Sequence, residues 1–385
     1  MQKTIAILAT TLIIFTGCTA KKQSSDELIT IDVTASYPKK ELILQDFMDV
    51  EYIPLETTDE FLCQGLLQAV GKDIVIVRNR TQDGNIFIYD RHGKAIKRIN
   101  RLGQGGEEYQ RIARVVLDEE NGELFVNDNA SKRIMVYDMN GTFRRSLHYK
   151  GKIVYDYIYN FDQKNLICNN GSLRNEGQSF LIISKLDGSI TKEIYIPFKE
   201  KKQVWLSKTD ETTGLTYILS PGNSPIVPYS NGWLLVEESS DSVYSYLPDH
   251  TMKPFIARTP SIQSMDPETF LLMRALTKDY IFMESVIKKG DLIKQTGLPS
   301  TYLVYDRASK TIFNQTVYND DYTVKTVVEM NSAPINNEIT NYQILNANNL
   351  VEYYSEGKLK GRLKEIATTL NEESNPVIML VKQKK

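Results

Sequence analysis

Oxygen-bearing side chains directly follow two apolar stretches of this sequence, and their chemistry suits a bound cation. Asn127 and Asp128 come after the apolar residues 124–126, and Glu237 comes after residues 233–236. Carboxylate and amide oxygens are the ligands that Ca²⁺ and other hard divalent cations take in proteins. If the ends of the two stretches meet in space, these three residues form an all-oxygen metal site. The alternative, which we favour, is that each residue caps a turn or faces solvent.

Tyrosines at alternating positions are the second set of candidates. Tyr155, Tyr157 and Tyr159 point to one face if residues 155–159 form a strand. Tyr244 and Tyr246 have the same spacing further along the chain. Exposed rings of this kind would stack on sugar rings or on peptide side chains. Buried rings would fill the core between sheets, which is the interpretation that we favour.

Motifs for the common catalytic chemistries are missing from the sequence. It has three histidines, and His92 and His250 both fall in expected turns. No Gly-x-Ser-x-Gly elbow for a serine nucleophile occurs. The glycine-rich residues 103–106 lack the Gly-Lys-Ser/Thr ending of a phosphate-binding loop, so they indicate a turn between sheets. We therefore assign no catalytic residue.

The N-terminus carries the pattern of a lipid attachment site. Lys3 precedes an apolar run, residues 5–15, which is too short to span a membrane, and Cys18 follows it. The pattern predicts a lipoprotein signal peptide over residues 1–17, cut before Cys18, whose thiol then carries a diacylglycerol. Acyl chains at this position would anchor the protein in a membrane. Because Thr19 follows the cysteine, and not an aspartate that signals inner-membrane retention, we expect the outer membrane of the cell envelope.

The rest of the chain has the composition of a folded, soluble domain. The formal net charge of −2 gives no reason to expect nucleic acid as a partner. No second apolar run reaches the length of a membrane span, so we expect a polar tether over residues 18–28 and a single domain over residues 29–385. Cys63 and Cys168 are expected as buried strand residues, and a disulfide between them stays open.

A repeated hairpin pattern is the strongest structural signal in the chain. Residues 86–93 recur 48 positions later as residues 134–141, and both combine an apolar strand with a turn that ends in glycine. A third copy covers residues 180–188, and two looser copies cover residues 243–250 and 302–309. A more apolar hairpin lies upstream of each copy, and a sixth follows the last copy. The expected turns of these inner hairpins are Gly71-Lys72, Asn121-Gly122, Lys164-Asn165, Asn231-Gly232, Lys289-Gly290 and Ala347-Asn348.

Two successive hairpins form one four-stranded unit, and six inner hairpins predict an all-β, six-bladed β-propeller. The sixth unit is incomplete, and we expect an N-terminal strand to complete it, either residues 29–33 or residues 50–55. A helix is expected over residues 357–370 and a last strand over residues 377–381. Another helix is expected to begin at Asp266-Pro267, within the long fifth unit.

The second unit resembles the NHL-type propeller repeat. It has a glycine-rich lead-in at residues 103–109, an aspartate after its second strand at Asp128, and Arg133-Ile134 at the start of its third strand. With the lipid attachment site, the segment 50–56 and the ending 375–377, the whole chain resembles the six-bladed β-propeller lipoproteins of Bacteroides and its relatives. The resemblance implies the fold and a location in the cell envelope. It implies no reaction, because one fold hosts many functions.

Three functions are compatible with this sequence. The first is a non-enzymatic module that binds a glycan, a peptide or an envelope protein through loops at one mouth of the ring, including the insertion near residues 200–222. The second is a propeller hydrolase, lactonase or lyase that holds Ca²⁺ or another divalent cation in the central channel through Asn127, Asp128 and Glu237. The third is a structural subunit that packs on another envelope protein. We favour the first, which requires no cofactor.

Overall fold

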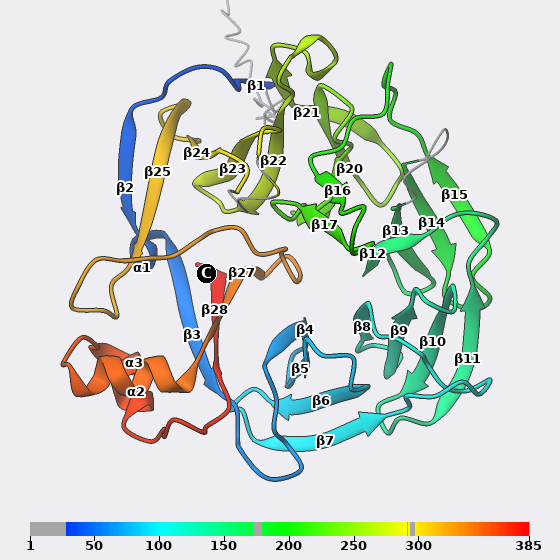
Figure 1. Cartoon of the computed structure of the whole chain (residues 1–385), viewed down its shortest axis with the longest axis vertical. Helices are drawn as coiled ribbons and strands as arrows, with labels where there is room; N and C mark the ends of the chain where they lie inside the picture. Colours follow the sequence, from blue (N-terminus) through cyan, green and yellow to red (C-terminus); the bar gives the residue numbers. More distant parts are fainter. Residues whose placement is uncertain (1–27, 172–178, 291, 293–296, 385) are drawn as a thin grey trace, which may run out of the picture.

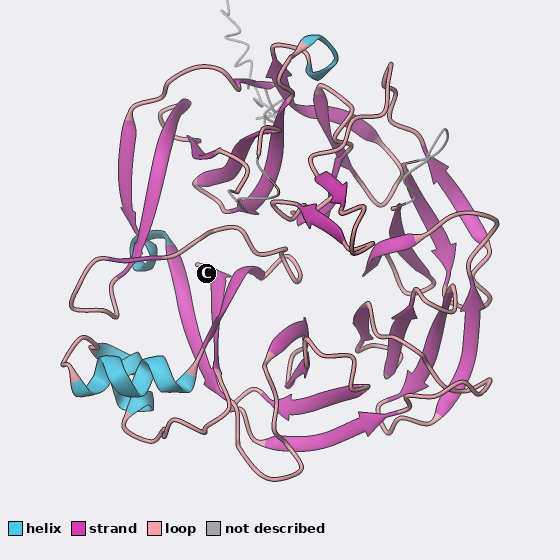
Figure 2. Cartoon of the chain, in the orientation of Figure 1, coloured by secondary structure: helices cyan, strands magenta, loops and turns pink. Residues whose placement is uncertain are grey.

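The computed structural model of the chain is a ring of six β-sheets (Figure 1). The space that the inner strands line at the centre of the ring is called the central channel. The structure describes residues 28–171, 179–290, 292 and 297–384, so Cys18 and the predicted signal peptide lie outside the described residues. Strands dominate the ring, and the helical segments are few and short (Figure 2). The predicted six-bladed β-propeller is confirmed.

Blades 1 to 3 follow the predicted repeat, and each has four consecutive antiparallel strands. Gly93, Gly141 and Gly188 end the turns between the third and fourth strands, with φ values of +84°, +78° and +72°. Glycine is favoured in this left-handed region because it has no Cβ. The strands are β4 (Leu66–Val70), β5 (Ile74–Arg78), β6 (Asn85–Asp90) and β7 (Ala95–Asn100) in blade 1, β8 (Arg114–Asp118), β9 (Glu123–Asp128), β10 (Arg133–Asp138) and β11 (Phe143–His148) in blade 2, and β12 (Tyr155–Asn160), β13 (Asn165–Asn170), β14 (Phe180–Ser184) and β15 (Ile190–Ile194) in blade 3.

Blades 4 and 5 have the same antiparallel core and one additional strand each from the N-terminal part of the chain. Their own strands are β18 (Ile226–Tyr229), β19 (Gly232–Val236), β20 (Ser242–Tyr246) and β21 (Met252–Thr259) in blade 4, and β22 (Thr269–Leu276), β23 (Tyr280–Ile287), β24 (Ser300–Asp306), β25 (Thr311–Asn319) and the short β26 (Thr326–Val327) in blade 5. β1 (Ile29–Asp32) pairs in parallel with β21, and β2 (Lys39–Ile43) pairs in parallel with β25. The segment 29–33 therefore extends blade 4 and does not close the ring.

Blade 6 joins the two ends of the described chain and closes the ring. It consists of β27 (Ile339–Leu345), the C-terminal strand β28 (Val377–Gln383) and β3 (Met48–Pro54), in this order. β28 is antiparallel to both neighbours, and Val377 lies opposite Pro54. Residues 377–381 are all buried, so β28 lies inside its sheet and not at an edge. The segment 50–55 is thus the closing strand, and the predicted last strand is confirmed.

Apolar clusters between neighbouring blades hold the ring together. One cluster lies at each of the six contacts between blades, because each sheet has a neighbour on both faces. The inner strand β22 shows the consequence, since all eight of its residues are buried. A strand that is covered on both faces loses the alternation of apolar and polar residues by which strands are recognised.

Two predictions for blade 5 are wrong, because β22 is buried on both faces and lacks the alternation of a typical strand. We expected a helix from Asp266-Pro267, because Phe270, Met273 and Leu276 have helical spacing, but residues 269–276 form the strand β22. The expected inner turn at Lys289-Gly290 lies after β23, and the turn between β22 and β23 covers residues 277–279.

The C-terminal helices also differ from the prediction. α2 (Ala347–Ser355) occupies the expected turn at Ala347-Asn348 and the strand expected after it. The nine residues of α2 are too few to distinguish the period of a strand from that of a helix by sequence alone. In the structure Ala347 and Leu350 are buried, and their spacing of three residues is helical. α3 (Gly361–Ala367) lies within the predicted helix 357–370 but is shorter. The remaining helical segments are α1 (Leu44–Phe47) and the 3-10 turn η1 (Ile262–Ser264).

Two smaller features complete the fold. The insertion near residues 200–222 forms a hairpin of β16 (Leu206–Thr209) and β17 (Thr216–Leu219). Cys63 and Cys168 are both free. Cys168 is buried on β13, as predicted, whereas Cys63 is half-buried in the loop before β4, so its expected place on a strand is wrong.

Candidate functional site

The central channel contains a cavity of about 630 Å³. Its walls come from the inner strands β4, β8 and β12, from the start of β19 and from the segment 334–337 that precedes β27. The turns after the inner strands, among them residues 119–120 and 161–163, line one end of the cavity, which we call the turn end. Arg114, the first residue of β8, lines the other end, which we call the arginine end.

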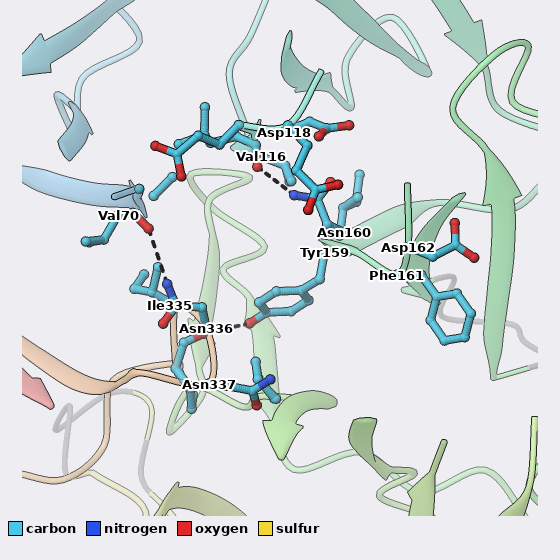
Figure 3. A pocket seen from close by; sticks show the side chains of 18 of the residues that line it. Val70, Val116, Asp118, Tyr159, Asn160, Phe161, Asp162, Ile335, Asn336 and Asn337 are labelled. Atoms are coloured by element: carbon cyan, nitrogen blue, oxygen red, sulfur yellow. Dashed lines mark hydrogen bonds between the residues drawn. The ribbon is translucent and has the colours of Figure 1, made fainter. Parts of the chain in front are cut away.

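Aromatic and amide side chains form the wall beside the segment 334–337 (Figure 3). The Tyr159 hydroxyl donates a hydrogen bond of 3.2 Å to the carbonyl oxygen of Pro334, and Asn336 Nδ2 donates one of 3.2 Å to the carbonyl oxygen of Val70. The Tyr159 ring packs on Trp233 with 5.4 Å between ring centroids. These bonds fix the segment between blades 3 and 1, so the wall is in place before any ligand binds.

Asn160 lines this cavity and has one acceptor without a partner in the described part of the chain. Its Nδ2 donates a hydrogen bond of 2.6 Å to the carbonyl oxygen of Leu117, whereas its Oδ1 is buried and has no hydrogen-bond partner among the described residues. A buried acceptor without a partner destabilises the fold by about 1–3 kcal/mol.

Three of the four carboxylates at the turn end are already engaged, and the fourth, Glu120, is exposed and has no hydrogen-bond or ion-pair partner among the described residues. Asp118 pairs with Lys185 at 2.7 Å, and the two side chains are only 5% and 6% exposed. Glu119 accepts hydrogen bonds of 2.9 and 3.0 Å from the backbone N–H of Lys72. Asp162 accepts two hydrogen bonds of 2.7 Å, from the backbone N–H groups of Lys164 and Asn165 in its own turn. These three acidic groups stabilise turns and blade contacts, and they are poorly placed to exchange protons with a ligand.

The structure does not bring the predicted cation ligands together. Asn127 donates to the carbonyl oxygen of Tyr155 at 2.8 Å and accepts from the Tyr149 hydroxyl, within the contact between blades 2 and 3. Asp128 is fully buried and accepts from backbone N–H groups around it. Glu237 lies in blade 4 and pairs with Lys201 at 2.7 Å. Among the described residues, no group of three or more histidine, cysteine, aspartate or glutamate side chains is arranged to hold a metal ion.

The three tyrosines of β12 do not share one face. A bulge in β12 turns Tyr155 toward blade 2, where its ring lies 4.5 Å from that of Tyr149. Tyr157 and Tyr159 pack instead at the contact with blade 4. The expectation of a common face is therefore wrong, because a bulge shifts the alternation by one residue.

The other candidate tyrosines lie away from the cavity wall. Tyr246 is 2% exposed, and its hydroxyl lies 2.8 Å from His250 Nδ1. Tyr244 is half-buried at the same contact between blades 3 and 4. Of the five predicted tyrosines, Tyr159 alone lines the 630 Å³ cavity.

A second cavity, of about 280 Å³, lies between blade 3 and the insertion hairpin. Tyr157, Trp205, Glu237 and Glu238 line it. Burial raises the pKa of Glu238, although the backbone N–H of Val204 donates to its carboxylate at 2.9 Å. This cavity therefore contains a carboxyl group with a perturbed pKa, but its neighbour Glu237 is held by Lys201.

Three residues at the central cavity were missed by sequence reasoning. Trp233 stands in an apolar run that predicts only a strand, and Asn336 lies in a segment without any repeat. Arg114 opens an inner strand, a position that has no sequence signature of its own. These residues lie around one cavity because the ring closes, and no local sequence pattern predicts that arrangement.

Residues 28–382 match a family model described as a domain of unknown function, DUF4934. The chain belongs to the DUF4934 family. The match covers the ring, the added N-terminal strands and the C-terminal helices, so all of them are parts of the DUF4934 domain. No curated protein matches this sequence.

Solved structures share the fold of this DUF4934 chain. A proposed exported protein from Bacteroides fragilis has a TM-score of 0.61 and 15% identity, over 93% of this chain and 100% of the other. A DUF4221 family member from Bacteroides vulgatus has a TM-score of 0.48 and 11% identity, over 88% and 98%. A virginiamycin B lyase from Staphylococcus aureus has a TM-score of 0.34 and 12% identity, over 69% and 98%. Only the first likeness is close enough to support the fold, and none of them assigns chemistry to this chain.

In the part of the chain that the structure describes, no helix is both long enough and apolar enough to cross a bilayer.

Proposed function

We propose that this DUF4934 protein is a lipid-anchored binding protein of the cell envelope, at the outer membrane, that holds a small polar ligand in its central channel without catalysing a reaction on it. The observation that carries the proposal is a cavity of about 630 Å³ that Asn160, Tyr159 and Trp233 line. Concave sites with aromatic walls and a few fixed polar groups are typical of small-molecule binding.

The state of the acidic groups favours binding over catalysis. General acid–base chemistry needs a titratable group that is free to face the substrate. At the turn end, Asp118, Glu119 and Asp162 hold a lysine or backbone N–H groups instead. A ligand would meet the amide of Asn160 and the rings of Tyr159 and Trp233, which bind and orient but do not transfer protons. Glu120 is the one carboxylate at this end that no described residue holds.

The chain offers a built-in reporter for this proposal. It has two tryptophans, so Trp205→Phe leaves Trp233 as the only indole, at the cavity wall. We expect its fluorescence to change saturably with at least one probe from a panel of N-acetylglucosamine, cellobiose, glucuronate and trialanine. Asn160→Ala should weaken that response about tenfold, because one buried hydrogen bond is lost. Asn140→Ala, at an exposed turn, is the matched control.

Two results would contradict the proposal. One is a Trp233 response of equal affinity in the Asn160→Ala and Asn140→Ala proteins. The other is an EDTA-reversible rise in melting temperature with Ca²⁺, Mg²⁺, Mn²⁺ or Zn²⁺, which would favour the cation-dependent enzyme.

The lipid anchor has its own test. Cys18→Ala should abolish palmitate labelling and move the protein from the membrane fraction to the soluble fraction, because the acylated thiol is the only expected attachment. Separation of the inner and outer membranes would then assign the wild-type protein to one of them. Labelling that persists in Cys18→Ala would contradict the anchor.

A further inference from the structure

Three arginines gather at the arginine end of the channel. Arg114 opens the inner strand β8, Arg111 lies just before it, and Arg78 ends β5 in the neighbouring blade. Arg78 Nη2 donates to the carbonyl oxygen of Ala113 at 3.4 Å, which places its guanidinium beside the start of β8. Arg114 therefore lines the cavity, and the charges of Arg78 and Arg111 lie close to it.

The two inner guanidinium groups are held in place and keep unused donors. Arg114 lies over the ring of Tyr157 with its Cζ 4.1 Å from the ring centroid. Arg78 Nη1 donates to the carbonyl oxygen of Asn79 at 2.7 Å, while Arg78 Nε is buried and has no hydrogen-bond partner among the described residues. Stacking on an aromatic ring and a fixed backbone contact orient the planar donor edges before a ligand arrives.

Counter-charges are missing around this cluster. Within the described part of the chain, no ion pair joins Arg78, Arg111 or Arg114 to a carboxylate, whereas Arg145 and Arg274 each pair with a glutamate, at 2.6 and 2.5 Å. The acidic groups that face the cluster are few. Asp83 lies near Arg78 but accepts hydrogen bonds from asparagine side chains at 2.6 and 3.0 Å, and Asp156 lies beside Tyr157.

The electrostatics agree with this geometry. Burial, and after it the positive charges of Arg114 and Arg111, lower the pKa of Arg78. Like charges held together without a counter-ion destabilise the folded state, and such arrangements concentrate at functional sites. An anion bound between the guanidinium groups would remove this repulsion.

We propose that the arginine end of the channel binds the oxyanion group of a small ligand, a carboxylate, sulfate or phosphate, between Arg114 and Arg78, with Arg111 at the rim. The planar guanidinium fork matches these oxyanions with paired hydrogen bonds. The inference rests on the proposed function, because it assigns chemistry to one end of the channel ligand. The neutral, hydroxyl-bearing part of that ligand would extend along the cavity toward Asn160.

Thermal melting with defined anions tests this proposal. We would melt the purified protein with sodium sulfate, phosphate or glucuronate, with sodium chloride at matched ionic strength and glucose as controls. The oxyanions should raise the melting temperature saturably, because they bind the folded state only. Arg114→Gln and Arg78→Gln should each weaken the response at least tenfold, and Arg114→Lys should weaken it less. Arg98→Gln, an exposed arginine on β7, removes the same charge and should leave the response unchanged.

A second readout separates a binding role from a structural one. Without added oxyanion, Arg114→Gln should melt at or above the temperature of the wild-type protein, because it relieves repulsion. A purely structural arginine would give a lower melting temperature instead. Circular dichroism of each variant confirms that it is folded.

The outcomes distinguish this inference from the proposed function. Equal oxyanion responses in Arg114→Gln and Arg98→Gln, or no oxyanion response in the wild-type protein, overturn the arginine site. If a neutral sugar still changes the Trp233 fluorescence in that case, the channel binds a ligand without an anionic group. If the oxyanions bind through the arginines and no probe reaches Trp233, the proposed channel function fails and a separate anion site remains.

Discussion

The ammonium group of Lys185 is buried between blades 2 and 3, where it contacts Asp118 at 2.7 Å and the carbonyl oxygen of Asp162 at 2.7 Å. Asp118 also accepts a hydrogen bond of 2.8 Å from Asn121 Nδ2. A buried charge is tolerated when it is paired and hydrogen-bonded, and these contacts engage two of the three donors of the ammonium group. The same pair links two inner turns, so it fixes the shape of the turn end of the cavity.

Removal of one partner should reveal how strongly this pair is needed. Lys185→Met keeps the length of the side chain but leaves Asp118 buried without its counter-ion, and we expect the free energy of unfolding in urea to fall by about 3–5 kcal/mol. Lys150→Met, at an exposed position, is the control. The double variant Lys185→Met with Asp118→Leu should recover part of the loss. A loss below 1 kcal/mol in the single variant would contradict the argument.

At the scale of elements, the turns decide how the blades meet. Gly93 ends the turn between β6 and β7 with φ of +84°, and a Cβ at this position would lie 1.9 Å from the carbonyl oxygen of Pro54 in β3. Gly122 has a similar φ of +64° in the turn between β8 and β9, with open space around it. One turn therefore packs against the closing blade, and the other faces solvent.

These two glycines form a matched pair for substitution. Gly122→Ala should lower the free energy of unfolding by about 1–2 kcal/mol, the cost of left-handed backbone for a residue with a Cβ. Gly93→Ala should cost at least about 2 kcal/mol more, since β3 must also move. Urea denaturation of both variants measures the difference. Equal losses would show that the contact with Pro54 adds nothing.

The elements that could be predicted from the sequence are those whose signal is local. Alternating apolar residues and glycine turns identified the hairpins of blades 1 to 4. β22 could not be recognised, because burial on both faces removes its alternation. The prediction of a strand at α2 was wrong because a nine-residue amphipathic run fits both the helical and the strand period. Of the central cavity only Tyr159 was predicted, since Arg114, Trp233 and Asn336 meet there through ring closure alone.

At the scale of the whole molecule, an ion cluster spans the closure of the ring. Glu51 on β3 contacts Lys382 on β28 at 2.9 Å and Arg91 in the β6–β7 turn at 2.6 Å. Burial alone would raise the pKa of Glu51, but the hydrogen bonds from Lys382 and Arg91 outweigh it, so the pKa lies below its usual range. The carboxylate therefore joins the first blade to both strands that close the ring.

The sign of the resulting pH dependence follows from the lowered pKa. Glu51 contributes stability above the pKa of the unfolded chain, about 4.3, and this contribution is lost as the pH falls through the lower pKa of the folded state. We expect the free energy of unfolding to fall less steeply from pH 5 to pH 3 in Glu51→Gln than in the wild-type protein. Glu211→Gln, in the exposed insertion, is the control. Parallel profiles for Glu51→Gln and the wild-type protein would contradict the role of this cluster.

The central position of β28 in blade 6 also governs the order in which the molecule can assemble. β28 follows all the other described strands along the chain and lies between β27 and β3, and its partner Pro54 precedes the strands of blades 1 to 3. Contacts so distant along the chain form slowly. We therefore expect blade 6 to close after blades 1 to 5 have formed. Such a late step would also make the finished ring slow to open, and slow opening protects a protein from proteolysis.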